Sequence, residues 1–208
     1  MIYFVKKPNW VRKFYGDCTW EVSTKEKVLY LTFDDGPDPD QTPFVLEQLE
    51  KFNAKATFFC LGKNVIAHPA VFATVINRGH VVGNHSFSHL DGWKTSNKKY
   101  FSDIAEAARY ITTPLFRPPF GHITWRQVNE LKSEGYKLKT VLWDVLSADF
   151  DENTSGEKCL LNVTEHARPG SIILFHDSGI ASRNMRYALP RVLEHYSNEG
   201  YRFEGLRL

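Results

Sequence analysis

Short apolar runs alternate with longer amphipathic stretches along most of the chain. The apolar runs are rich in β-branched, aromatic and aliphatic residues and are bounded by Gly, Pro, Asp or Asn, a pattern that predicts strands. They lie at residues 28–33, 56–61, 80–83, 115–117, 138–143, 171–175 and 201–203. Several of the stretches between them end directly before a glycine, the usual residue after a helix.

We predict helices at residues 69–78, 97–111, 125–134, 156–167 and 184–199, and one more that begins at Thr42. In that helix Thr42 is expected to cap the N-terminus, with Pro43 in the first helical position. Alternating strands and helices imply a mainly parallel sheet with the helices outside it.

Polar residues stand at or just beyond the carboxyl ends of five predicted strands. They are Asp34 and Asp35, His85 and His89, Arg117, Asp149, and His176. About seven parallel strands can form either an open sheet or an incomplete barrel, and a barrel mouth is the arrangement that collects side chains from all around the sheet. We therefore predict an α/β fold, an incomplete and distorted TIM-like (β/α) barrel with about seven parallel strands.

The two histidines of His85-Ser-Phe-Ser-His89 are four residues apart. In a helical turn this spacing places both imidazoles on one face, where they can bind one metal ion. A carboxylate would complete a site that keeps positions open for water and substrate, as catalytic zinc requires. The same ligand set also binds iron in oxygenases, so the residues alone leave the metal open.

Asp34 and Asp35 stand at a strand end, before Gly36 and Pro37. Neighbouring carboxylates repel, so a cation that captures one of them leaves the other to act as a base. The alternative is a polar turn whose acids cap a helix.

His176 follows an apolar run directly, so its imidazole emerges from a buried strand toward the same barrel mouth. This position favours a general acid or base over a packing role. The remaining histidines are expected to be surface or packing residues: His68, His80, His122, His166 and His195.

From about residue 28 to its end, the chain resembles the polysaccharide deacetylases of carbohydrate esterase family 4, the NodB homology domain. Thr32–Gly36 (TFDDG) and His85–His89 (HSFSH) match the first two motifs of that family. Arg117–Gly121 (RPPFG) matches the third except that Phe120 replaces the usual Tyr, and Leu174–Asp177 (LFHD) fits the last. Several short motifs in the right order are much more specific than any one of them.

The resemblance implies that Asp35, His85 and His89 bind a divalent metal, commonly zinc. It also implies that Asp34 is the general base that takes a proton from the attacking water, with Arg117 holding its carboxylate. These roles are chemically sensible, because a metal ion polarises a carbonyl and makes water a better nucleophile.

On the substrate side, the resemblance implies that the metal and the backbone N–H of Phe120 stabilise the oxyanion. His176 would protonate the departing amine and Asp149 would orient its ring. An amine leaves poorly unless it is protonated, so this acid is required. Leu174 would line the pocket for the acetyl methyl group.

The fourth motif departs from the family pattern Asp-x-x-Asp-Trp. Leu146 replaces its first Asp and Phe150 its Trp, while Asp149 is kept. The two replacements, at Leu146 and Phe150, are therefore expected to alter the wall of the acetyl or sugar pocket, and this affects the identity of the substrate more than the catalytic groups.

The predicted function is metal-dependent hydrolysis of N-acetyl groups on an amino-sugar glycan such as a chitin-like oligomer, peptidoglycan or a related precursor, with release of acetate. One alternative is an O-acetyl glycan esterase. The other is a non-catalytic glycan-binding relic of the fold, although such a relic would be expected to lack Asp34 or His176.

Composition excludes several other classes of protein. The net charge is +2 over 208 residues, with 24% charged residues and no long basic run, which argues against nucleic-acid binding. No apolar stretch approaches the ~20 residues of a transmembrane helix. Three cysteines, an odd number with no close pairs, fit structural thiols better than a disulfide framework.

We predict two parts: an N-terminal arm at residues 1–24, with a short helix opened by Pro8, and a catalytic domain at residues 25–208. The first residues lack the apolar core of a secretory signal, so the expected location is cytoplasmic. Basic and aromatic residues around Trp10 leave a peripheral contact with a membrane surface open. The sequence does not define the oligomeric state.

Overall fold

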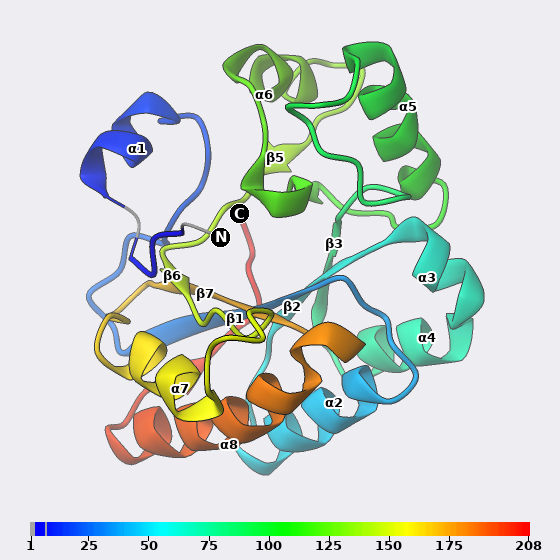
Figure 1. Cartoon of the computed structure of the whole chain (residues 1–208). Coiled ribbons are helices and arrows are strands. Elements are labelled where there is room, and N and C mark those ends of the chain that lie inside the picture. The colour runs from blue at the N-terminus through cyan, green and yellow to red at the C-terminus, as the bar shows by residue number, and fades with distance from the viewer. Residues whose placement is uncertain (1–2, 7) are drawn as a thin grey trace.

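Strand β1 (Val28–Asp34) lies in the middle of the sheet in the computed structural model, which describes residues 3–6 and 8–208. It pairs in parallel with β2 (Thr57–Cys60) on one side and with β7 (Ile172–His176) on the other. The order through the sheet is β5-β4-β3-β2-β1-β7-β6, and β8 pairs with β1 off this path. Seven parallel strands thus form a curled, incomplete barrel, and the predicted fold class is confirmed (Figure 1).

The other strands are short. They are β3 (Val81–Asn84), β4 (Leu115–Phe116), β5 (Lys139–Thr140), β6 (Val145–Leu146) and β8 (Arg202–Phe203). The strand predicted at 138–143 is shorter in the structure, where only Lys139–Thr140 form β5. No strand was predicted at β6, which stands at the opposite end of the strand order. The segment between β5 and β6 crosses from one end to the other, so Asp149 follows β6.

The helices surround the strands. They are α1 (Asn9–Phe14), α2 (Gln41–Lys51), α3 (Gly62–Ala67), α4 (Pro69–Asn77), α5 (Asn97–Ala108), α6 (Trp125–Leu131), α7 (Gly156–Thr164) and α8 (Ser182–Asn198), with short 3₁₀ turns η1 (Pro119–Gly121) and η2 (Gly179–Ala181). Figure 1 shows α2, α7 and α8 side by side on one side of the strands. Among the described residues no helix has the length and apolar character needed to cross a membrane.

The predicted start of α2 is wrong. Asp40 occupies the cap position, and Thr42 lies inside the first turn. The Thr42 hydroxyl donates to Asp177 Oδ2 at 2.5 Å, so a partner distant in sequence uses the side chain that was expected to cap the helix.

Alternation along β1 places neighbouring residues in two different cores. Leu29, Leu31 and Phe33 pack toward the outer helices, and all three are fully buried. Successive side chains of a strand point to opposite faces, so Thr32 and Asp34 face the inside of the barrel. The sequence of β1 therefore delivers one carboxylate to the interior at the strand's carboxyl end.

The N-terminal arm spans the gap between the two outer strands of the path. The carbonyl oxygen of Val5 accepts from the backbone N–H of Leu146 in β6, and Thr19 forms a parallel bridge with Val141 next to β5. Lys6 Nζ lies 2.5 Å from the buried carboxylate of Asp144, and Arg12 contacts the same carboxylate. Backbone hydrogen bonds and ion pairs with Asp144 thus attach the arm to the barrel. Helix α1 begins at Asn9, with Pro8 in its cap position.

Candidate active site

Asp34 and Asp35 stand at the end of β1, and both carboxylates lie close to His85. Asp34 is 3% exposed, and its Oδ1 accepts from Arg117 Nη1 at 2.8 Å. Asp35 has φ 77°, in the left-handed region, so the chain turns there, and its Oδ1 lies 3.6 Å from His85 Nε2.

The turn after Asp35 depends on Asp177, a residue for which the sequence suggested no role although it belongs to the last matched motif. Its Oδ1 accepts from the backbone N–H of Gly36 at 3.1 Å, and its Oδ2 accepts from Thr42. A Cβ on Gly36 would lie 2.2 Å from the Asp177 carboxylate, so only glycine fits. Burial raises the pKa of Asp177 well above the usual range.

His85 stands just after β3 and is buried. Its Nδ1 lies 2.7 Å from the carbonyl oxygen of Arg117. A carbonyl only accepts, so Nδ1 carries the proton and the lone pair is on Nε2. Burial lowers the pKa of His85, which keeps the ring neutral as a metal ligand must be.

His89 reaches the same place through a loop, so the prediction that a helical turn aligns the two histidines is wrong. Ser86 and His89 have φ of 67° and 64°, and residues 85–89 contain no helix. Asn84 Oδ1 accepts from the N–H of Ser86 at 2.7 Å, and Ser86 Oγ accepts from the N–H of His89 at 3.1 Å. Short-range polar contacts of this kind fold the loop back on itself and bring the imidazoles together.

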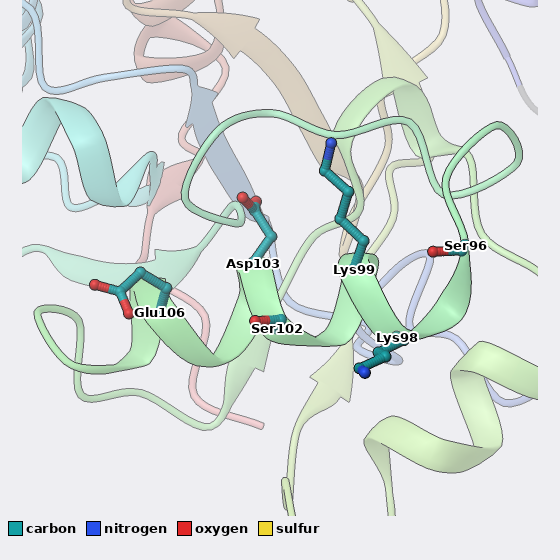
Figure 2. Close-up of a pocket in the computed structure, with 6 residues that line it drawn as sticks. All are labelled: Ser96, Lys98, Lys99, Ser102, Asp103 and Glu106. Atoms are coloured by element: carbon teal, nitrogen blue, oxygen red, sulfur yellow. The ribbon is translucent and has the colours of Figure 1, made fainter.

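Helix α5 holds the outer side of this loop. Asp103 Oδ2 accepts from the backbone N–H groups of Phe87 and Ser88, both at 2.9 Å. Figure 2 shows Asp103 rising from α5 toward the loop, beside a surface pocket of about 450 Å³. That pocket is lined by Ser96, Lys98, Lys99, Ser102, Asp103 and Glu106, which include none of the predicted site residues.

Asp35, His85 and His89 form one cluster whose ligand atoms all lie within 4.8 Å of one another. Asp35 Oδ1 is 3.6 Å from His85 Nε2 and 3.2 Å from His89 Nε2. This buried oxygen has no hydrogen-bond partner in the described part of the chain. A buried carboxylate oxygen without a donor, facing two imidazoles, fits a divalent cation, since burying such a group unpaired is costly.

Arg117 is fully buried and connects the base to the barrel interior. Besides Asp34, its guanidinium donates to Thr32 Oγ1 at 2.7 Å and to the carbonyl oxygen of Leu142 at 3.0 Å. It also lies over the ring of Phe59, 4.1 Å from the centroid. With these partners the guanidinium has one orientation, and it fixes one oxygen of Asp34.

His176 and Asp149 form a second pair, delivered by β7 and the segment after β6. Asp149 Oδ1 lies 2.8 Å from His176 Nδ1, and its Oδ2 accepts from the backbone N–H of His176 at 2.8 Å. Burial lowers the pKa of His176, but the charge of Asp149 and its hydrogen bond outweigh this and raise it to about 9. His176 is the register partner of Asp34, so the pair stands next to the carboxylates.

The residues expected at the substrate have different surroundings. Phe120 has φ 61° and is 53% exposed, with its ring centroid 4.5 Å from that of His89. Leu174 is buried and is the register partner of Leu146, which is also buried. Phe150 packs edge-on against His176 at 5.3 Å. The change at 146 is thus part of the core, whereas the change at 150 touches the predicted acid.

The fold and this ligand set together are those of a metal-dependent hydrolase of the (β/α)-barrel type. The family model for polysaccharide deacetylase matches residues 21–138, more than half of the chain. The chain belongs to the polysaccharide deacetylase family.

Relatives over most of the chain support the assignment. A peptidoglycan-N-acetylglucosamine deacetylase of Bacillus cereus is 38% identical over 90% of this chain and 90% of its own length. A chitooligosaccharide deacetylase of Azorhizobium caulinodans is 32% identical over 75% of this chain and 76% of its own. The crystal structure of a peptidoglycan N-acetylglucosamine deacetylase superposes with a TM-score of 0.85 at 31% identity, covering 96% of this chain and 95% of that one.

The fold by itself does not imply activity. A pseudoenzyme of carbohydrate esterase family 4 from Bacillus anthracis has a TM-score of 0.77 to this chain at 22% identity, covering 90% of this chain and 66% of that one. Catalysis therefore depends on which side chains the site carries.

Proposed function

We propose that this chain hydrolyses the N-acetyl groups of an amino-sugar glycan, peptidoglycan foremost, with zinc as its metal. The observation that carries the proposal is the placement of two acid–base pairs, Asp34–Arg117 and His176–Asp149, beside one cluster of three metal-ligating side chains. Family membership and the peptidoglycan deacetylases among the relatives support the substrate class.

Asp35, His85 and His89 would hold the metal. The neutral His85 ring and the partner-free oxygen of Asp35 suit zinc, which takes nitrogen and oxygen ligands and keeps a position open when three protein groups bind it. When bound, zinc supplies Lewis-acid polarisation of the acetyl carbonyl and lowers the pKa of water.

Asp34 has the position of a general base. Arg117 occupies its Oδ1, and its Oδ2 lies 3.8 Å from His85 Nε2, beside the ligand cluster but not part of it. Because the buried guanidinium holds Oδ1, the other oxygen, Oδ2, stays beside the ligand cluster and can take the proton of the water as it attacks the acetyl carbon.

His176 has the position of the general acid. Asp149 accepts from Nδ1, so Nε2 is the nitrogen that exchanges its proton with the substrate. A pKa of about 9 leaves the ring protonated at neutral pH, ready to donate to the amine nitrogen as the carbon–nitrogen bond breaks. Breaking an amide needs such a donor, whereas an ester with a good leaving group does not. The protonated imidazole therefore supplies the proton that N-deacetylation requires.

The direct test is acetate release from purified peptidoglycan and from N-acetylglucosamine oligomers, with zinc-loaded and chelator-treated protein. We expect release that is lost with the metal and restored by zinc. Asp34→Asn should abolish release while metal content, measured by elemental analysis, stays at one ion per chain. A zinc-loaded parent that releases no acetate from any acetylated glycan would contradict the proposal and favour the binding relic.

A further inference from the structure

Trp93 and His122 form an aromatic stack outside the motifs considered so far. Their ring centroids are 3.8 Å apart and their planes differ by 7°. Trp93 is 58% exposed. Since His122 covers one face of the indole, the solvent-exposed area lies on the opposite face.

The stack is held rigidly. Trp93 Nε1 donates to the carbonyl oxygen of Ile123 at 3.1 Å, and its backbone N–H donates to Asp91 Oδ1 at 2.9 Å. His122 Nδ1 lies 3.1 Å from Asp91 Oδ2. One carboxylate thus holds both members of the stack. A large apolar surface kept in one orientation loses little entropy when a ligand covers it.

Phe120 connects the stack to the metal cluster. Its ring lies 5.7 Å from that of His122 on one side and 4.5 Å from that of the metal ligand His89 on the other. Aromatic surface therefore continues from the cluster to Trp93, and both Phe120 and Trp93 are more than half exposed.

We propose that Trp93, stacked on His122, is a binding platform for a sugar ring adjacent to the one whose acetyl group is removed. This inference rests on the proposed function and adds a subsite to it. The apolar face of a pyranose covers an aromatic ring well. The ring N–H of Trp93 is satisfied within the protein, so it requires nothing from the ligand.

The test compares Trp93→Ala and Trp93→Phe with a matched control, Trp125→Ala. Trp125 begins α6 and is also 58% exposed. Each zinc-loaded variant is assayed on the N-acetylglucosamine tetramer and on p-nitrophenyl acetate, a small ester that does not reach the platform. Thermal unfolding checks that each variant is folded.

We expect Trp93→Ala to raise KM for the tetramer roughly ten-fold, with kcat and ester hydrolysis close to the parent. Trp93→Phe should recover part of the affinity, and Trp125→Ala should match the parent. A KM for the tetramer within two-fold of the parent in folded Trp93→Ala would overturn the platform.

Calorimetric binding separates this inference from the proposed function. The tetramer is titrated into zinc-loaded Asp34→Asn protein with and without Trp93→Ala. Binding that weakens on loss of the indole supports the platform even if the parent releases no acetate. Equal binding, or no binding in either protein, overturns the platform even if the parent is a deacetylase.

Discussion

His85 Nδ1 and the carbonyl oxygen of Arg117 lie 2.7 Å apart, and the guanidinium of the same arginine holds Asp34 at 2.8 Å. The main chain of Arg117 therefore orients a proposed metal ligand while its side chain orients the proposed base. Since the base and the metal must act on the same water, one residue fixes their relative position. A substitution at Arg117 would remove the guanidinium from Asp34 but keep the main-chain carbonyl that contacts His85.

The role of His176 predicts a dependence on the leaving group. His176→Ala should lower kcat for an acetylated glycan by ~10²–10⁴-fold, the usual contribution of a general acid. Hydrolysis of p-nitrophenyl acetate should fall much less, because a phenolate leaves without protonation. His195→Ala, an exposed histidine on α8, is the control. Equal losses on both substrates would argue against His176 as the acid.

Asp149 predicts a shift in the pH profile. Its charge and hydrogen bond raise the pKa of His176 to about 9, above the ordinary 6.5. Asp149→Asn removes the charge, so burial lowers the pKa and activity should be lost at lower pH on the alkaline side. The kcat–pH profile measures this, with Asp151→Asn as the control. An alkaline limb that stays in place would show that another group sets it.

The His176–Asp149 pair also makes the stability of the folded protein depend on pH. Because the folded pKa of His176 is raised, its contribution is fully present below pH 6.5 and is lost as the pH rises toward 9. In Asp149→Asn this decline should disappear. Urea unfolding across that range measures the free energy directly.

Asp103 predicts an effect on metal affinity from outside the ligand cluster. Without its carboxylate the N–H groups of Phe87 and Ser88 lose their acceptor, and the loop that carries His89 is less ordered. Asp103→Ala should weaken zinc binding ~10–100-fold, the usual cost of losing a group that supports a ligand. Glu106→Gln, one turn further along α5, is the control. A folded Asp103→Ala protein with the parent's zinc affinity would contradict this role.

We expect the substitution Gly36→Ala, which adds one methyl group, to destabilise the folded protein. The Cβ of Gly36→Ala would lie 2.2 Å from the buried Asp177 carboxylate, which cannot move without losing its bonds to Gly36 and Thr42. We expect a destabilisation of about 1–3 kcal/mol, typical of overpacking, in urea unfolding. Gly179→Ala, whose Cβ meets open space, should be close to neutral. Similar stabilities for the two variants would mean that the turn yields easily.

The sequence predicts most of the site because strand ends carry it. Period-two alternation in β1 and β7 and the shared direction of parallel strands are enough to bring Asp34 and His176 together. Local geometry was harder to predict. The spacing of His85 and His89 indicated a helix, but side-chain contacts to the backbone at Asn84 and Ser86 stabilise a loop instead. Such contacts compete with helix formation and leave no periodic signal.

Two other features were not predictable from local pattern. Thr42 is engaged by Asp177, a contact across 135 positions. His122 was expected to be a surface or packing residue, and its stacking on Trp93 depends on how two loops meet. In the sequence, the proximity of both residues to the matched motifs pointed to the site. Trp93 comes soon after His89, and His122 directly follows the third motif. The expected cytoplasmic location and the domain boundary at residue 24 stay predictions.

The backbone hydrogen bond at Val5 and the bridge at Thr19 have a consequence for the behaviour of the chain in solution. A strand without a neighbour presents free N–H and C=O groups that can template pairing with another molecule. In this barrel the first residues cover those groups at β6 and beside β5. Removing residues 1–22 would expose these backbone groups at β6 and beside β5. It would also leave the buried carboxylate of Asp144 without Lys6 and Arg12. A chain without the arm is therefore expected to self-associate through these uncovered strand edges.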